Sequence, residues 1–112
     1  MSIELYNYQA TCTRVIDGDT IVCDIDLGFY TIIKYQIFRL ARINAPELPT
    51  PEGIKSKEFL KKLIEGKDIV VKSGKLESAK EIFGRWLGEI YFNCENVNDI
   101  LLKSGNVVLY KY

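Results

Sequence analysis

The first half of the chain shows the alternation of apolar and polar positions that is typical of β-strands. Segment 10–16 is rich in Thr and Val, and Asp17-Gly18 then supplies a tight hairpin turn. In segment 21–27 apolar residues at every second position alternate with polar or smaller ones, and Gly28 ends the run. A third β-rich segment, 30–43, is dense in Ile, Tyr and Phe. These patterns predict a meander of three strands.

After the third segment, prolines end the strand character and a helical period begins. Thr50-Pro51 is typical of a helix start, and Glu52 lies in the first turn, where the helix dipole favours an anion. Gly66 is placed to end this helix. One apolar stripe follows the helical period, formed by Phe59, Leu60, Leu63 and Ile64.

The rest of the chain predicts strands over 69–72 and 87–92, a short helix over 98–104 stopped by Gly105, and an extended segment, 107–112. We expect a mobile loop over 73–82. The element order predicts an α+β, mainly β fold: a five-stranded OB-type barrel with one helix between strands 3 and 4 and a short helix near the C-terminus. A length of 112 residues is that of a single domain, 1–112.

Composition removes several function classes. The chain has no histidine, which excludes a histidine triad, ligand or general base. Its 15 basic and 15 acidic residues balance, so nucleic-acid binding would need a local arrangement of charge. The three widely spaced cysteines are interpreted as buried small hydrophobes in a reducing compartment. No apolar run is long enough for a membrane helix, and no signal peptide is visible, so we expect a cytoplasmic protein. A monomer is expected, although the sequence leaves the oligomeric state open.

Two clusters of polar residues in the predicted meander are candidates for chemistry. In Asp17-Gly18-Asp19-Thr20 a structural turn explains Asp17, whose side chain can accept from the backbone, but not Asp19. Arg39 and Arg42 interrupt an otherwise core-forming strand. Because their parity on a strand is opposite, they are expected to point to opposite faces, so at least one has a special environment.

Two further clusters lie in loops. Asn44-Ala45-Pro46-Glu47 holds an amide and a carboxylate three residues apart, which alone is a weak indication of function. Phe83-Gly84-Arg85-Trp86 places an arginine at the entry to a strand, where a solvated arginine is the ordinary explanation.

Taken together and in order, these motifs resemble the staphylococcal nuclease (thermonuclease) family. The resemblance runs from about residue 10 to 112, and the family's OB-type barrel agrees with the fold predicted from the patterns. The motifs that carry it are Asp-Gly-Asp-Thr (17–20), Phe-Arg-Leu (38–40), Ala-Pro-Glu (45–47), Phe-Gly-Arg (83–85) and Val-Asn-x-x-Leu (97–101), followed by Gly105.

The resemblance implies calcium-dependent hydrolysis of phosphodiester bonds in DNA and RNA, with low sequence specificity. Calcium is a hard cation that takes oxygen ligands, so the absence of histidine is expected of such an enzyme. The matching positions are Asp19, Asn44 and the Ala45 carbonyl for the metal, Glu47 for activation of water, Arg39 and Arg85 for the scissile phosphate, and Phe83, Tyr110 and Tyr112 for the bound nucleotide.

The chain also departs from the family's pattern. Asn44 stands where aspartate is usual, which removes a charge from the metal site, and Ala45 replaces the usual threonine. The hairpin over 24–34 is longer than in the best-known member, and a basic loop and a C-terminal helix are missing. An alternative is therefore a catalytically impaired domain that only binds nucleic acid. Glu47 together with both arginines favours a nuclease, and nothing in the sequence favours a protein–protein adaptor.

Overall fold

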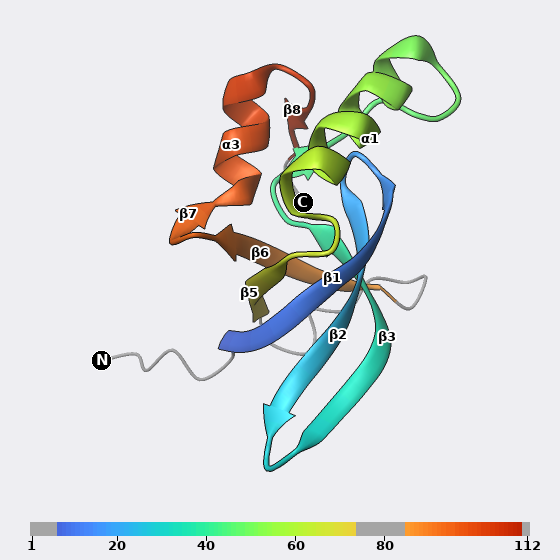
Figure 1. The fold of residues 1–112 in the computed structure, drawn as a ribbon. Coiled ribbons are helices and arrows are strands. Elements are labelled where there is room, and N and C mark those ends of the chain that lie inside the picture. The colour runs from blue at the N-terminus through green and yellow to red at the C-terminus, as the bar shows by residue number, and fades with distance from the viewer. Residues whose placement is uncertain (1–6, 74–84, 111–112) are drawn as a thin grey trace.

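Five strands close into a small barrel (Figure 1). The computed structural model describes residues 7–73 and 85–110. Neighbours in the order β3-β2-β1-β5-β6 are antiparallel, and a parallel pairing of β3 with β6 closes the sheet on itself. This arrangement confirms the predicted five-stranded OB-type barrel. The strands are β1 (Asn7–Asp17), β2 (Thr20–Gly28), β3 (Thr31–Leu40), β5 (Asp68–Ser73) and β6 (Trp86–Phe92).

The two predicted helices lie at one end of the barrel, the upper end in Figure 1. Helix α1 (Pro51–Ile64) begins as expected, with the Thr50 side chain accepting a hydrogen bond from the Gly53 N–H at 3.0 Å. It packs against β1, and it ends two residues before Gly66. Helix α3 (Val97–Ser104) packs against β6 and ends at Gly105, which is left-handed at φ 81°. In the described part of the chain, neither helix is long and apolar enough to span a bilayer.

The third predicted strand ends earlier than its composition indicates. Strand β3 stops at Leu40, and the chain turns at Ala41 and Arg42, whose φ of 70° lies in the left-handed region. After the turn comes β4 (Ile43–Asn44), which pairs with β8 (Val108–Leu109) near the C-terminus. The prediction of one strand over 30–43 was therefore wrong, because an Ala-Arg turn lacks the residues that usually mark such a bend. A further short strand, β7 (Glu95–Asn96), pairs back onto β6.

The core fills the barrel and the space under the helices. From the predicted helical stripe, Leu60 and Ile64 are fully buried, and Phe59 and Leu63 pack partly buried against the same cluster. The other fully buried large side chains come from both sheet and helices and include Ile21, Leu40, Ile43, Val71, Ile90, Val97 and Leu101.

The three cysteines are free thiols with different environments. Cys12 and Cys23 lie opposite each other on β1 and β2 and are fully buried, as predicted. Their mutual hydrogen bond lowers the pKa of Cys12 and raises that of Cys23. The prediction was wrong for Cys94, which is exposed in a tight turn with φ 67°.

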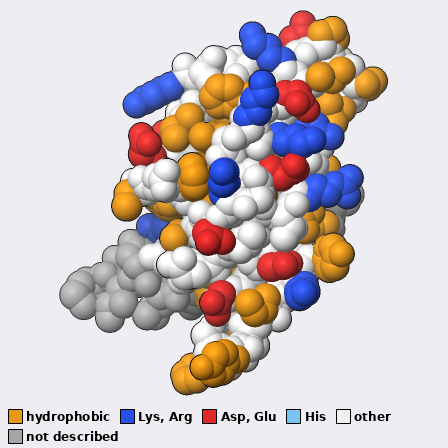
Figure 2. Space-filling view, viewed as in Figure 1, with side chains coloured by type: hydrophobic (Ala, Val, Ile, Leu, Met, Phe, Trp, Pro, Cys, Tyr) orange, Lys and Arg blue, Asp and Glu red, His pale blue; other side chains and the backbone are white. Residues whose placement is uncertain are grey.

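The β2–β3 hairpin projects beyond the barrel, at the lower end of the view in Figure 1. Hydrophobic side chains gather at its tip in Figure 2. The tip residues Phe29 and Tyr30 are 98% and 107% exposed, and both are left-handed, at φ 54° and 59°. The tip therefore combines strained backbone with side chains that gain nothing from burial.

Candidate active site

The β1–β2 turn directs the Asp19 side chain toward the loop that carries Ala45. Asp17 and Thr20 are register partners, so the turn itself consists of Gly18 and Asp19. Asp17 Oδ1 accepts a hydrogen bond from the Asp19 N–H at 3.0 Å, the structural role predicted for it. The Asp19 carboxylate accepts from the Ala45 N–H at 2.9 Å through Oδ2 and from the Thr20 hydroxyl at 3.0 Å through Oδ1. Asp19 is only 7% exposed, so this carboxylate is directed at the Ala45 loop and not at bulk water.

Arg39, at the end of β3, joins the predicted metal ligands. It is the register partner of Thr20 and is 7% exposed. Its Nη2 lies 3.6 Å from Asp19 Oδ2 and donates to Asn44 Oδ1 at 2.9 Å. One guanidinium nitrogen thus contacts a side-chain oxygen of both Asp19 and Asn44, which brings three of the predicted site residues together.

The loop that carries Glu47 is held by the first two turns of α1. The Glu47 carbonyl accepts hydrogen bonds from the N–H and the hydroxyl of Thr50, while the Glu47 side chain is exposed. A Cβ on Gly53 would overlap the same carbonyl oxygen, and a Cβ on Gly18 would overlap Ser56. Small residues therefore let α1 pack directly on the site, against both the Glu47 loop and the β1–β2 turn.

The remaining predicted residues come from β6 and the C-terminus. Partly buried Arg85 directly precedes β6, whose Leu87 is the parallel register partner of Arg39, so the two arginines come from adjoining strands. The Tyr110 ring lies over the Arg39 guanidinium, 5.1 Å from Cζ to the ring centroid. Phe83 and Tyr112 lie outside the described residues, as does most of the loop predicted over 73–82.

The predicted metal ligands are of the type that calcium prefers, but they include a single carboxylate. Burial and the neighbouring Asp19 carboxylate raise the pKa of Asp17 to about 6. Within residues 7–73 and 85–110 no three His, Cys, Asp or Glu side chains cluster in a way that could hold a metal ion. The set present is a carboxylate, an amide oxygen and a backbone carbonyl, all hard oxygen donors, so the residues fit calcium by chemical type but provide little negative charge.

The structure also shows roles that the sequence did not predict for Arg42 and Asn98. Arg42 was placed by strand parity, but it lies in a turn and pairs with Glu89 and Asp99. Buried Asn98 accepts from the Ile90 N–H and donates to the carbonyls of Ala41 and Gly88. Asn98 stands in the Val-Asn-x-x-Leu motif, which was the available signal for it, whereas the signal for Arg42 was its place in an otherwise core-forming segment.

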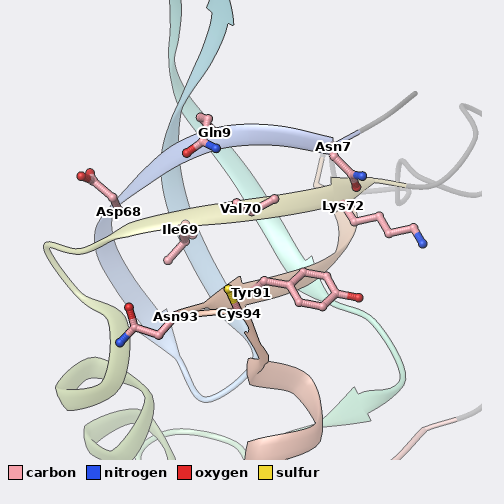
Figure 3. Close-up of a pocket in the computed structure, with 9 residues that line it drawn as sticks. All are labelled: Asn7, Gln9, Asp68, Ile69, Val70, Lys72, Tyr91, Asn93 and Cys94. Carbon is pink, nitrogen blue, oxygen red and sulfur yellow. The ribbon is translucent and has the colours of Figure 1, made fainter. Parts of the chain in front are cut away.

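A shallow pocket of about 440 Å³ lies elsewhere, along β1, β5 and β6 (Figure 3). Figure 3 shows it lined by Asn7, Gln9, Asp68, Ile69, Val70, Lys72, Tyr91, Asn93 and Cys94. None of the predicted site residues that the structure describes lines this pocket, so the pocket is separate from the candidate active site.

The fold and these contacts define an OB-type barrel with an arginine and an acidic turn joined at one end. The family model described as "Staphylococcal nuclease homologue" matches residues 37–112. The chain belongs to the staphylococcal nuclease family.

Curated relatives agree with this assignment. The chain is 33% identical over 110 residues to a probable staphylococcal-like nuclease of Oryza sativa subsp. japonica, covering 89% of this chain and 28% of the relative. It is 32% identical over 103 residues to an uncharacterized endonuclease of Haemophilus influenzae, covering 90% of this chain and 53% of the relative. A similar endonuclease of Escherichia coli O157:H7 is 33% identical over 100 residues, with 88% and 58% covered. The chain thus spans between about a quarter and three fifths of the length of these relatives.

Proposed function

We propose that the chain is a calcium-dependent phosphodiesterase that hydrolyses DNA, RNA or both as an endonuclease of low sequence specificity. The observation that carries this proposal is the contact of one Arg39 nitrogen with both Asp19 and Asn44. It joins a phosphate-binding cation to two oxygen ligands. Arg39 and Asp19 are both buried, which strengthens the electrostatic interaction between them, whereas Asn44 is exposed. Membership of a nuclease family supports the same reading.

In this proposal Asp19, Asn44 and the Ala45 carbonyl hold calcium, which when bound would polarise the phosphate and acidify water. Arg39 and Arg85 donate hydrogen bonds to phosphate oxygens as negative charge grows in the transition state. The planar guanidinium group of each can donate to two oxygens at once. Glu47, exposed on its loop, accepts the proton of the attacking water. Residues Phe83, Tyr110 and Tyr112 flank the nucleotide, whose base can stack on an aromatic ring.

A nucleic-acid-binding domain without catalysis is the second candidate, and Asn44 is the observation that favours it. The amide supplies an oxygen but no charge, and that oxygen accepts a hydrogen bond from Arg39. Calcium affinity depends on ligand charge, so a site with one carboxylate ligand is weak.

One experiment separates the two. The purified chain is incubated with single-stranded DNA in millimolar calcium or in excess chelator, beside Asp19→Asn. That variant removes the charge and keeps one oxygen able to accept from Ala45 N–H, while an NH2 group replaces the oxygen that accepts from the Thr20 hydroxyl. We expect cleavage by the wild type in calcium, none in chelator, and a large loss in the variant. Binding without cleavage would support the second candidate, and cleavage in chelator would contradict calcium dependence.

A further inference from the structure

Arg42 ties the turn after β3 to two other elements. Its Nε donates to Glu89 Oε2 at 2.7 Å and its Nη2 donates to Glu89 Oε1 at 2.8 Å, a two-pronged pairing with a carboxylate of β6. The same Nη2 donates to Asp99 Oδ1 in the first turn of α3 at 2.9 Å. We call these three side chains, Arg42, Glu89 and Asp99, the turn clamp. Asn96 supports it by donating to Glu89 Oε1 at 2.9 Å.

The backbone of Arg42 leads directly to Tyr110. At φ 70° Arg42 has a conformation that residues with a side chain rarely adopt, so other contacts must maintain it. Its carbonyl accepts a hydrogen bond from the Tyr110 N–H at 2.8 Å, next to the Ile43–Leu109 register pair. Tyr110 in turn places its ring over the guanidinium of Arg39.

The stability that the turn clamp can supply is small. The side chains of Arg42 and Asp99 are 40% and 53% exposed, and an ion pair this open to water stabilises the fold only weakly. Yet the clamp coincides with an unfavourable backbone conformation of Arg42, at the point where β8 meets the site. The main effect of the turn clamp is therefore on the position of the backbone and not on the stability of the fold.

We propose that Arg42 is a positioning residue for substrate binding: the turn clamp fixes the Arg42 carbonyl, which holds Tyr110 over Arg39 and so preforms the aromatic wall against which a nucleotide packs. The inference rests on the proposed function, since Tyr110 is taken to contact the nucleotide. It assigns Arg42 no contact with substrate. The proposal distinguishes Arg42 from Arg39, which takes part in the site itself.

The test is a double-mutant cycle between Arg42→Gly and Tyr110→Ala. Glycine tolerates the left-handed backbone, so Arg42→Gly removes the clamp without adding strain. Loss of one aromatic stack in Tyr110→Ala should raise KM for single-stranded DNA by about tenfold. Arg42→Gly should raise it roughly fivefold, at the low end of the same range, with kcat within about twofold of the wild type. In the Tyr110→Ala background, Arg42→Gly should change KM no further.

Two controls isolate the clamp. Arg42→Lys keeps the charge but cannot donate to both oxygens of Glu89, so KM should fall between the wild type and Arg42→Gly. Lys61→Ala removes the cation of an exposed pair with Glu65, 4.0 Å apart on α1, and should leave KM unchanged. The Arg39 Nε–H resonance, shifted by the Tyr110 ring current, reports the contact in the absence of substrate. It should move toward its position in Tyr110→Ala when Arg42→Gly is introduced.

Each outcome has a distinct meaning. A wild-type protein that neither cuts nor binds DNA overturns the proposed function, while the Arg39 resonance still decides whether the clamp holds Tyr110. An active wild type with unchanged KM in Arg42→Gly overturns the inference alone and leaves Arg42 a structural residue. An equal rise of KM in both backgrounds also overturns it, since Arg42 would then act by a route that does not pass through Tyr110.

Discussion

The Asp19 carboxylate accepts the backbone N–H of Ala45 at 2.9 Å, across 26 positions of sequence. The contact ties the first hairpin turn to the loop after β4. Two of the three predicted metal ligands thus reach their places through one hydrogen bond, and the third, Asn44, precedes Ala45 in the chain. Asp19 has a structural role beside its proposed catalytic one, which is why Asp19→Asn, and not Asp19→Ala, is the informative substitution.

Arg39→Lys and Arg85→Lys should each lower kcat by roughly 10²-fold. Lysine keeps the charge, but it lacks the two fixed N–H donors with which a guanidinium group binds two phosphate oxygens in the transition state. Steady-state cleavage of single-stranded DNA in calcium measures this. Arg14→Lys, the same change at an exposed position on β1, serves as the control and should retain full activity. Unchanged kcat in both site variants would make these arginines structural.

Asn98→Ala should lower the free energy of unfolding by about 3 kcal/mol, because it leaves the Ile90 N–H and the Ala41 carbonyl without this buried partner. Urea unfolding followed by Trp86 fluorescence gives the value. Asn106→Ala, at a partly exposed position after α3, should stay within about 0.5 kcal/mol of the wild type. Equal effects of the two substitutions would contradict a special role of Asn98.

The fold was predictable from the sequence because its signals are local. The Thr50-Pro51 start of α1 and Gly105 after α3 each act within a few residues, and each was confirmed. The strand predicted from the alternation over 21–27 is also present as β2, although Val22 is buried and Leu27 exposed, against that alternation. The turn at Ala41 and Arg42 was not predictable, because neither residue usually marks a bend and the partners of Arg42, Glu89 and Asp99, lie far along the chain. The conformational preferences of neighbouring residues do not predict such a backbone conformation.

The candidate site, like the fold, was predictable from the sequence only in part. Motif order placed Asp19, Arg39 and Asn44 in one family pattern, and the structure brings their side chains together. Parity failed for Arg42, because the rule holds only while the strand continues. The position of Tyr110 over Arg39 follows from the pairing of β4 with β8. Each of these strands has two residues, which is too short a segment for a strand to be predicted from the sequence.

Asp17→Asn should change how the stability of the metal-free protein depends on pH. The folded-state pKa of Asp17, about 6, lies above the ordinary value of 3.8, so the folded state binds this proton more tightly than the unfolded state. The stability that this group contributes is present below about pH 4 and is lost as pH rises through 6. Urea unfolding in chelator between these pH values should show this loss in the wild type and not in Asp17→Asn, whose amide oxygen can still accept from the Asp19 N–H.

Asp26→Asn is the matched control for Asp17. Asp26 is exposed, and its Oδ1 also accepts a hydrogen bond from the backbone N–H two residues on, at 2.8 Å from Gly28 N. This variant should keep the wild-type pH dependence. A wild-type protein whose stability rises between pH 4 and 6 by as much as that of Asp17→Asn would show that the Asp17 environment does not favour its protonated form.

Replacing Phe29-Tyr30 by Asn-Gly should raise the free energy of unfolding by about 1–2 kcal/mol, since both positions are left-handed and both side chains fully exposed. Thermal and urea unfolding measure the gain. Tyr30→Ala removes the ring without relieving the backbone, so it should give no gain. A less stable Asn-Gly variant would mean that the aromatic rings contribute contacts in solution that outweigh the strain.

Asn44→Asp should lower the calcium concentration for half-maximal activity by on the order of tenfold, because calcium affinity in oxygen-ligand sites rises with ligand charge. The substitution adds a negative charge at a side chain that contacts the same Arg39 nitrogen as Asp19 does. At limiting calcium the variant should also cut faster. Titrating cleavage against calcium for both proteins measures the shift.

Asn93→Asp makes the same chemical change at an exposed turn outside the site and should leave the titration curve in place. One competing effect has the opposite sign: a new carboxylate at position 44 also strengthens the pairing with Arg39, which holds that guanidinium back from phosphate. That effect would lower kcat at saturating calcium, whereas the metal effect moves only the midpoint, so a full titration separates them. Identical midpoints for wild type and Asn44→Asp would remove Asn44 from the metal site and leave Asp19 as the single charged ligand there.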